Sequence, residues 1–205
     1  MQIDTYTGGA FETNSYFLPT QEGGVLIDAA EGVCDWLQSR GQRVSTLLIT
    51  HGHFDHVPDA ALLKKTFNCQ VGYHRDGIAM LTERHFFRRL GIPYDIEPIA
   101  ADFYVDETLS LTVDDLDFAV QHVPGHCPGS LCFLLKSERQ LFCGDVLFAG
   151  GIGRWDLPGG DRSLLIDGIT GKLLTLGDDV RVFPGHGPST TIGRERASNP
   201  FLTRP

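Results

Sequence analysis

Short apolar runs alternate along the chain with turns rich in glycine, proline and aspartate. Runs dominated by Val, Ile, Leu and Phe predict buried strands, and longer stretches with apolar positions three or four residues apart predict helices. The expected strands lie near residues 2–6, 14–18, 24–28, 46–50, 70–73, 110–113, 117–123, 131–135, 140–143 and 180–183. The expected helices lie near residues 32–40, 58–67, 76–90, 161–175 and 192–197.

Strand and helix patterns are interleaved in the first third of the chain, and the middle is rich in strands. This order predicts an α/β fold with two packed sheets. A chain of 205 residues is long enough to bury one core. We find no linker, low-complexity tract or internal repeat, so we expect a single domain over residues 1–205.

Charge and cysteine content narrow the choice of partners. The 17 basic residues against 26 acidic ones give a net charge of −9, which argues against nucleic acid as a partner. The first residues have neither a basic segment nor an apolar core, and no apolar run approaches the length that spans a membrane. Five scattered cysteines without a Cys-x-x-Cys pair fit reduced thiols. We therefore expect a cytoplasmic protein with no membrane partner.

Residues 50–56 read Thr-His-Gly-His-Phe-Asp-His and follow an apolar, strand-like run. In an extended chain, residues i and i+2 point to the same side, so His51 and His53 can hold one ion together. Asp55 and His56 follow where the chain turns toward a helix. That bend directs the second pair at a neighbouring point, which favours two metal ions over one.

The same arrangement recurs three more times along the chain. Apolar runs end in Gly125-His126, Gly144-Asp145 and Gly185-His186-Gly187. Ligand-type side chains at strand ends are how α/β proteins usually build their sites. One such turn is weak evidence alone, but four together predict a metal centre at one edge of the sheets.

These motifs, taken in order, resemble the metallo-β-lactamase-fold hydrolase superfamily. They are Leu-Ile-Asp28, Thr-His51-Gly-His53-Phe-Asp55-His56, Gly-His126-Cys-Pro-Gly-Ser130, Gly-Asp145 and Gly-His186-Gly. The stretch Gly153-Arg154-Trp-Asp156-Leu-Pro-Gly-Gly160 and the later Asn199-Pro200-Phe201 resemble the short glyoxalase II-like, or hydroxyacylglutathione hydrolase-like, branch. The resemblance implies a four-layer αββα sandwich, the metallo-β-lactamase fold.

The resemblance also implies a ligand set. One metal ion would be held by His51, His53 and His126, the other by Asp55, His56 and His186, and Asp145 would bridge the two. Imidazole and carboxylate donors without thiolate suit Zn²⁺ best, and they also admit Fe or Mn. Two divalent ions sharing a hydroxide imply hydrolysis of an acyl compound, with Asp55 a candidate proton acceptor as well as a ligand. The substrate implied is a small-molecule thioester such as S-lactoylglutathione.

Three further expectations concern the surroundings of the metals. Asp28 is expected to support the ligand loops through hydrogen bonds. Arg154 lies in a glycine-rich loop after Asp145. Relatives that use glutathione thioesters carry a basic residue at the corresponding position, where it resembles a group that binds the substrate carboxylate. The resemblance therefore implies a substrate contact for Arg154. Two interpretations are open for residues 76–104. They either arch over the metals or contain an ordinary helix packed on the core. In the first case they would replace the side of the substrate site that longer glyoxalase II enzymes build from a C-terminal helical domain.

Two other functions stay open at this point. Persulfide dioxygenases share the fold, the His-x-His-x-Asp-His run and a Gly-Arg-x-Asp loop, and they use one iron, for which His51, His126 and Asp145 would suffice. A binding or regulatory protein on the same fold would be expected to have lost a ligand, and none is lost here. The number of metal ions per chain distinguishes the two enzymatic alternatives.

Overall fold

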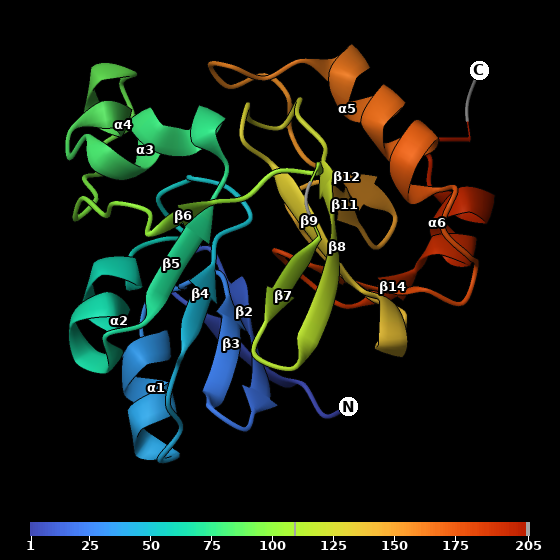
Figure 1. Ribbon diagram of the computed structural model, residues 1–205. Coiled ribbons are helices and arrows are strands. Elements are labelled where there is room, and N and C mark those ends of the chain that lie inside the picture. Colours follow the sequence, from blue (N-terminus) through green and yellow to red (C-terminus); the bar gives the residue numbers. More distant parts are fainter. Residues whose placement is uncertain (109, 204–205) are drawn as a thin grey trace.

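Two β-sheets pack face to face between two layers of helices in the computed structural model, which describes residues 1–108 and 110–203. Figure 1 shows α1 and α2 on the outer face of one sheet and α5 and α6 on the outer face of the other. This order of layers confirms the predicted four-layer αββα sandwich. In the part of the chain that is described, no helix combines the length and apolar character needed to cross a membrane.

The first sheet is built from the first half of the chain, and its strands follow one another in sequence order. Strands β1 to β3 are antiparallel, whereas β3, β4, β5 and β6 run parallel because helical segments connect them. Its strands are β1 (Asp4–Gly8), β2 (Thr13–Thr20), β3 (Gly23–Ile27), β4 (Thr46–Leu48), β5 (Gln70–Tyr73) and β6 (Phe103–Tyr104).

The second sheet has the order β14-β13-β10-β9-β8-β7, in which the neighbours β13 and β10 run parallel. A separate two-stranded ribbon pairs β11 with β12. The strands are β7 (Leu111–Val113), β8 (Leu116–His122), β9 (Leu131–Leu135), β10 (Gln140–Gly144), β11 (Leu147–Phe148), β12 (Gly151–Ile152), β13 (Arg181–Pro184) and β14 (Thr190–Thr191).

Strands buried on both faces explain the unbroken apolar runs in the sequence. In β9, Phe133 faces the other sheet, while Cys132 and Leu134 face the outer helices, and all five residues of the strand are buried. The helices contribute α1 (Val33–Ser39) and α2 (Ala60–Phe67) on one side, and α5 (Arg162–Gly168), continued by a π-helical turn (Ile169–Leu173), and α6 (Ile192–Ser198) on the other. The sandwich thus contains three apolar layers, one between the sheets and one under each pair of helices.

The single helix predicted over residues 76–90 is wrong. The structure has a 3₁₀ turn (Arg75–Gly77), α3 (Ile78–Thr82) and α4 (Phe86–Arg89), with an extended residue at Glu83. The carbonyl of Leu81 accepts a hydrogen bond from the Ile99 amide and that of Arg84 from the Ile96 amide. In a continuous helix these two carbonyls would accept hydrogen bonds from the amides four residues further along the chain. Because Ile96 and Ile99 donate to them instead, the helix breaks. Helix α2 likewise begins at Ala60 rather than at residue 58.

Candidate metal centre

The histidines and aspartates predicted from the motifs come together where strands of both sheets end. The first sheet supplies the loop after β4, which carries His51, His53, Asp55 and His56. The second sheet supplies the loops after β8, β10 and β13. These loops carry His126, Asp145 and His186. The structure therefore gathers all seven predicted ligands at one edge of the sandwich.

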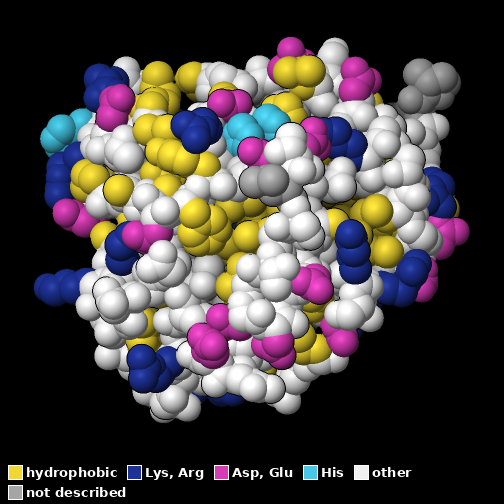
Figure 2. All heavy atoms as spheres, in the orientation of Figure 1, with side chains coloured by type: hydrophobic (Ala, Val, Ile, Leu, Met, Phe, Trp, Pro, Cys, Tyr) yellow, Lys and Arg dark blue, Asp and Glu magenta, His cyan; other side chains and the backbone are white. Residues whose placement is uncertain are grey.

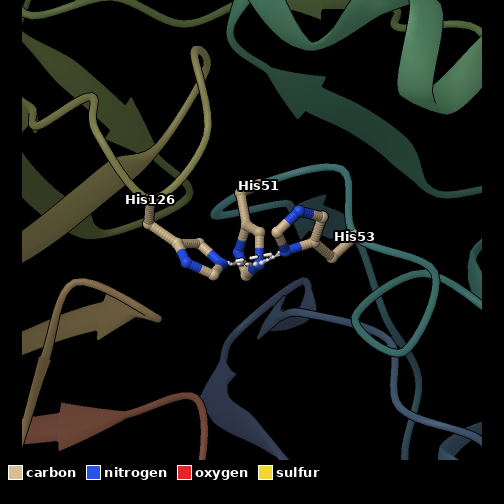
Figure 3. Close-up of side chains that lie close together, drawn as sticks. All are labelled: His51, His53 and His126. Carbon is tan, nitrogen blue, oxygen red and sulfur yellow. Dashed lines mark hydrogen bonds between the residues drawn. The ribbon is translucent and has the colours of Figure 1, made fainter. Parts of the chain in front are cut away.

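Three imidazoles form the first donor set, and their nitrogens point at one another (Figure 3). Nδ1 of His53 lies 3.1 Å from Nε2 of His51 and 2.8 Å from Nε2 of His126, and these two Nε2 atoms are 3.3 Å apart. Two ligand atoms of a tetrahedral zinc ion with bonds of about 2.0–2.1 Å lie about 3.3 Å apart. The triangle of nitrogens is therefore the size that one metal ion requires.

A second donor set lies beside the first and consists of Asp55, His56 and His186. Nε2 of His186 lies 3.2 Å from Oδ2 of Asp55 and 3.4 Å from Nε2 of His56. Thr13 on β2 donates a hydrogen bond of 2.9 Å to the same Oδ2 atom and thus orients the carboxylate. Nothing in the sequence pattern marks Thr13, because the chain brings it here only through the pairing of distant segments.

Asp145 touches both sets. One of its oxygens lies 3.2 Å from Nε2 of His56. The other lies 3.6 Å from Nε2 of His126 and 3.5 Å from Nε2 of His186. Within the described part of the chain, its buried Oδ1 atom has no hydrogen-bond partner. A buried carboxylate oxygen without a donor is costly unless a cation accompanies it, so this position fits a bridging ligand.

The outward nitrogens of four of the histidines are occupied, which fixes the tautomer of each ring. Nδ1 of His126 donates to the carbonyl of Arg154 at 2.8 Å, and Nδ1 of His186 donates to the carbonyl of Phe11 at 2.9 Å. His51 is held in the same way by the Thr50 hydroxyl and His56 by the Asp28 carboxylate. Each of these rings therefore directs Nε2 to the centre, the atom through which it would bind a metal ion.

Burial and charge divide the histidines into two groups. Burial lowers the pKa of His51 well below its ordinary value and that of His53 to about 3, and neighbouring imidazoles act in the same direction. Burial also opposes protonation of His186, but hydrogen bonds with Asp145 and Asp55 raise its pKa to about 10. The pKa of Asp55, although raised by burial, is held at about 2 by His186 and His56. The first set is thus neutral, and the second is built around ionised carboxylates that attract cations.

The expected supporting role of Asp28 is confirmed. Its Oδ1 atom accepts the backbone N–H of Thr50 at 2.7 Å, and its Oδ2 atom accepts the Thr50 hydroxyl at 2.7 Å. Thr50 immediately precedes the His-x-His-x-Asp-His run, so Asp28 holds the start of the ligand loop to the end of β3.

Arg154 lies on the loop that follows β12, and its backbone supports the centre through His126. The guanidinium is more than half exposed and forms a two-pronged ion pair with Asp156, with both hydrogen bonds at 2.8 Å. The structure therefore brings the backbone of Arg154 to the metal centre, while its side chain pairs with a neighbour on the same loop.

The segment after β5 packs against the ligand loop. The buried ring of Phe87 on α4 lies 6.3 Å from the His53 ring and 5.4 Å from the Phe54 ring, centre to centre. A Cβ atom on Gly52 would lie 2.7 Å from Cβ of Met80 on α3. Residues 76–104 therefore cover one side of the ligand loop as well as completing the apolar layer beneath it.

Comparison with known proteins agrees with this geometry. A family model described as the metallo-beta-lactamase superfamily matches residues 8–186, so the chain belongs to this superfamily. It is 37% identical over 209 aligned residues to the hydroxyacylglutathione hydrolase GloC of Haemophilus influenzae, with 98% of each chain covered. The predicted resemblance to the hydroxyacylglutathione hydrolase-like branch is thereby confirmed.

Two solved structures show the same fold over almost the whole chain. The B3 metallo-beta-lactamase BLEG-1 superposes with a TM-score of 0.90 at 36% identity, covering 99% of this chain and 100% of that one. TTHA1623, solved in a di-iron-bound form, gives a TM-score of 0.86 at 35% identity, covering 97% of this chain and 100% of that one.

Proposed function

We propose that this protein is a dinuclear metal-dependent hydrolase that cleaves S-acyl thioesters such as S-lactoylglutathione. The observation that carries the proposal is the pair of adjacent donor sets with Asp145 between them. The similarity to a hydroxyacylglutathione hydrolase over nearly the full chain supports the thioester as substrate class.

The residues divide between the two ions by their distances. His51, His53 and His126 would hold one ion, and Asp55, His56 and His186 the other, with Asp145 touching both sets. Zn²⁺ suits these donors best; Fe and Mn are the alternatives, and a relative with two irons supports iron in particular. When bound, two such ions supply a nucleophile at neutral pH and polarise the acyl carbonyl.

We assign two further residues to the reaction. Asp55 is proposed as both ligand and proton acceptor; its pKa of about 2 makes it a weak base and favours the ligand role. Arg154 is proposed to bind a carboxylate of the thiol portion, which requires its guanidinium to exchange Asp156 for the substrate.

The proposed setting is a cytoplasmic enzyme that acts on small molecules. The excess of acidic over basic residues supports the absence of a nucleic-acid partner. The five cysteines are all buried and unpaired, which agrees with a reducing compartment.

The decisive experiment measures metal content and turnover together. Protein purified without added metal is analysed by mass spectrometry, and then assayed with glutathione thioesters, a β-lactam and a persulfide. We expect two metal ions per chain and thioester hydrolysis. Asp145→Asn should lose metal from both sets and reduce turnover at least 100-fold, whereas Asp179→Asn, at an exposed position, should change neither.

Other outcomes overturn the proposal in distinct ways. One iron per chain with oxygen-dependent persulfide consumption would identify the mono-iron dioxygenase alternative. Rapid β-lactam cleavage without thioester turnover would place the chain functionally beside BLEG-1 rather than GloC.

A further inference from the structure

A pocket with a volume of about 220 Å³ opens beside the second donor set, and Asp55 forms part of its wall. A dry apolar cavity of roughly 150 Å³ is enough to bind benzene, so a small acyl group fits this space. The lining comes from the β1–β2 hairpin, the loop between β3 and α1, the ligand loop and the segment after α4: Gly8, Gly9, Ala10, Phe11, Thr13, Glu31, Phe54, Asp55, Pro58, Tyr94 and Asp95.

Three aromatic rings from distant parts of the chain form one wall of this pocket. Tyr94 stacks on Phe54 with ring centres 4.0 Å apart and planes within 4°. Phe11 meets both rings edge-on, at 5.2 Å from Phe54 and 5.8 Å from Tyr94. Phe11 is 46% exposed and Tyr94 39% exposed, so the wall offers open apolar surface. Figure 2 shows hydrophobic side chains gathered over the neighbouring α3 and α4 as well.

This aromatic wall is tied directly to the metal centre. Phe54 stands between His53 and Asp55 in the ligand loop. The carbonyl of Phe11 accepts the hydrogen bond that orients His186, and Thr13, another lining residue, orients Asp55. A group seated in the pocket therefore lies next to the second donor set, where an acyl carbonyl must be placed for hydrolysis.

The charged lining is entirely acidic. Among the described residues that line the pocket, Glu31, Asp55 and Asp95 carry carboxylates and none is Lys or Arg. Asp95 is paired with Arg88 and His85, which do not line the pocket, and these partners neutralise its charge. Asp55 is assigned to a metal ion, so among the described lining residues Glu31 is the carboxylate that keeps its negative charge uncompensated. An acyl carboxylate seated near Glu31 would meet like charge and is therefore disfavoured.

We propose that this pocket receives the acyl group of the thioester and selects neutral, apolar or aromatic acyl groups over carboxylated ones. The anionic thiol portion then lies outside the pocket. This inference rests on the proposed thioesterase function. It adds that the acyl group is the part of the substrate that decides specificity.

The first test compares three thioesters of one thiol: phenylacetyl-, lactoyl- and succinyl-glutathione. We expect kcat/KM for phenylacetyl to exceed that for lactoyl by roughly tenfold and that for succinyl by more, in line with the range of an apolar specificity pocket. Tyr94→Ala and Phe11→Ala should remove most of the phenylacetyl advantage. Glu31→Gln should raise kcat/KM for succinyl selectively. Tyr104→Ala, a similarly exposed tyrosine outside the pocket, should leave all ratios unchanged.

A second test does not depend on turnover. Calorimetry compares two non-hydrolysable thioether ketones of N-acetylcysteamine, one with a phenacyl and one with an acetonyl group, on the metal-loaded protein. Tighter binding of the phenacyl compound, lost in Tyr94→Ala, supports the pocket assignment even if no thioester is hydrolysed, in which case only the proposed reaction fails. Thioester hydrolysis with equal kcat/KM for all acyl groups, or equal binding of both ketones, overturns the inference.

Discussion

The Oδ2 atom of Asp28 accepts a hydrogen bond of 2.8 Å from Nδ1 of His56, and both side chains are buried. The same carboxylate holds the backbone and hydroxyl of Thr50. One carboxylate at the end of β3 therefore orients a proposed metal ligand and anchors the loop that carries four of these proposed ligands.

Asp28→Asn tests that relationship. Residue 28 has a φ of 59°, a left-handed conformation that Asn tolerates well, so the fold should be retained. Because a neutral amide is a poorer acceptor for His56, we expect metal affinity to fall by about 10- to 100-fold. Competition with a chromogenic chelator measures this affinity, with Asp179→Asn as the surface control. Unchanged affinity would mean that the hydrogen bond does not tune the site.

Gly185 packs against the ligands so closely that no side chain fits. A Cβ atom there would lie 2.6 Å from Cε1 of His56 and closer still to Oδ1 of Asp145. We expect Gly185→Ala to displace Asp145 and reduce the metal content below one ion per chain, although no ligand is replaced. Gly171→Ala is the matched control, since its Cβ meets nothing within 4 Å. Full metal content in Gly185→Ala, measured by mass spectrometry, would contradict this.

Arg154 and Asp156 make a paired prediction. Arg154→Ala should raise KM for a glutathione thioester by about 2- to 5-fold with little change in kcat, because an exposed contact of this kind contributes at most about 1 kcal/mol. Asp156→Asn should lower KM, since it frees the guanidinium from its ion pair. Steady-state kinetics with a thioester that lacks carboxylates in its thiol portion is the control, and equal effects on both substrates would remove Arg154 from the binding site.

The metal-free protein should lose stability at both ends of the pH range, for opposite reasons. The pKa of His53 is lowered to about 3, so its contribution is present above pH 6.5 and is lost as the pH falls from 6.5 toward 3. The pKa of His186 is raised to about 10, so its contribution is present below pH 6.5 and is lost as the pH rises toward 10.

Urea unfolding of chelator-treated protein at a series of pH values measures the free energy of unfolding on the acid limb, below pH 6.5, and on the alkaline limb, above pH 6.5. Each histidine contributes up to about 1.4 kcal/mol per pH unit within its own window. His53→Gln should flatten only the acid limb, and His186→Gln only the alkaline one. Parallel profiles for wild type and both variants would show that these groups do not govern the pH dependence.

The predicted strands overlap every strand longer than two residues, and in all of these except β1 buried positions leave apolar residues in the sequence. The two-residue strands β6, β11, β12 and β14 were not predicted, since such short pairings carry no periodicity. The break between α3 and α4 also escaped prediction, because it depends on hydrogen bonds from Ile96 and Ile99 that no local pattern records.

The candidate site also has parts that the sequence predicts and parts that it does not. The histidines and aspartates predicted from motifs at strand ends do lie near one another in the structure. The aromatic wall of Phe11, Phe54 and Tyr94 was not foreseen, because only the pairing of the β1–β2 hairpin and the packing of the segment after α4 bring these rings together. The hydrogen bond from His126 to the Arg154 carbonyl could not be predicted either, because any residue type can supply a backbone acceptor.

The division of the candidate metal centre between two sheets has a consequence for how the protein is made. His56 and His186, which meet across the second donor set, are 130 residues apart in the chain. At synthesis rates of about 5–20 residues per second, the second partner appears roughly 7 to 26 s after the first. His126 and Asp145 are synthesised within that interval, so the side chains of the first donor set are all present before His186 exists. The second donor set therefore forms last, only after β13 has been synthesised and has paired with β10.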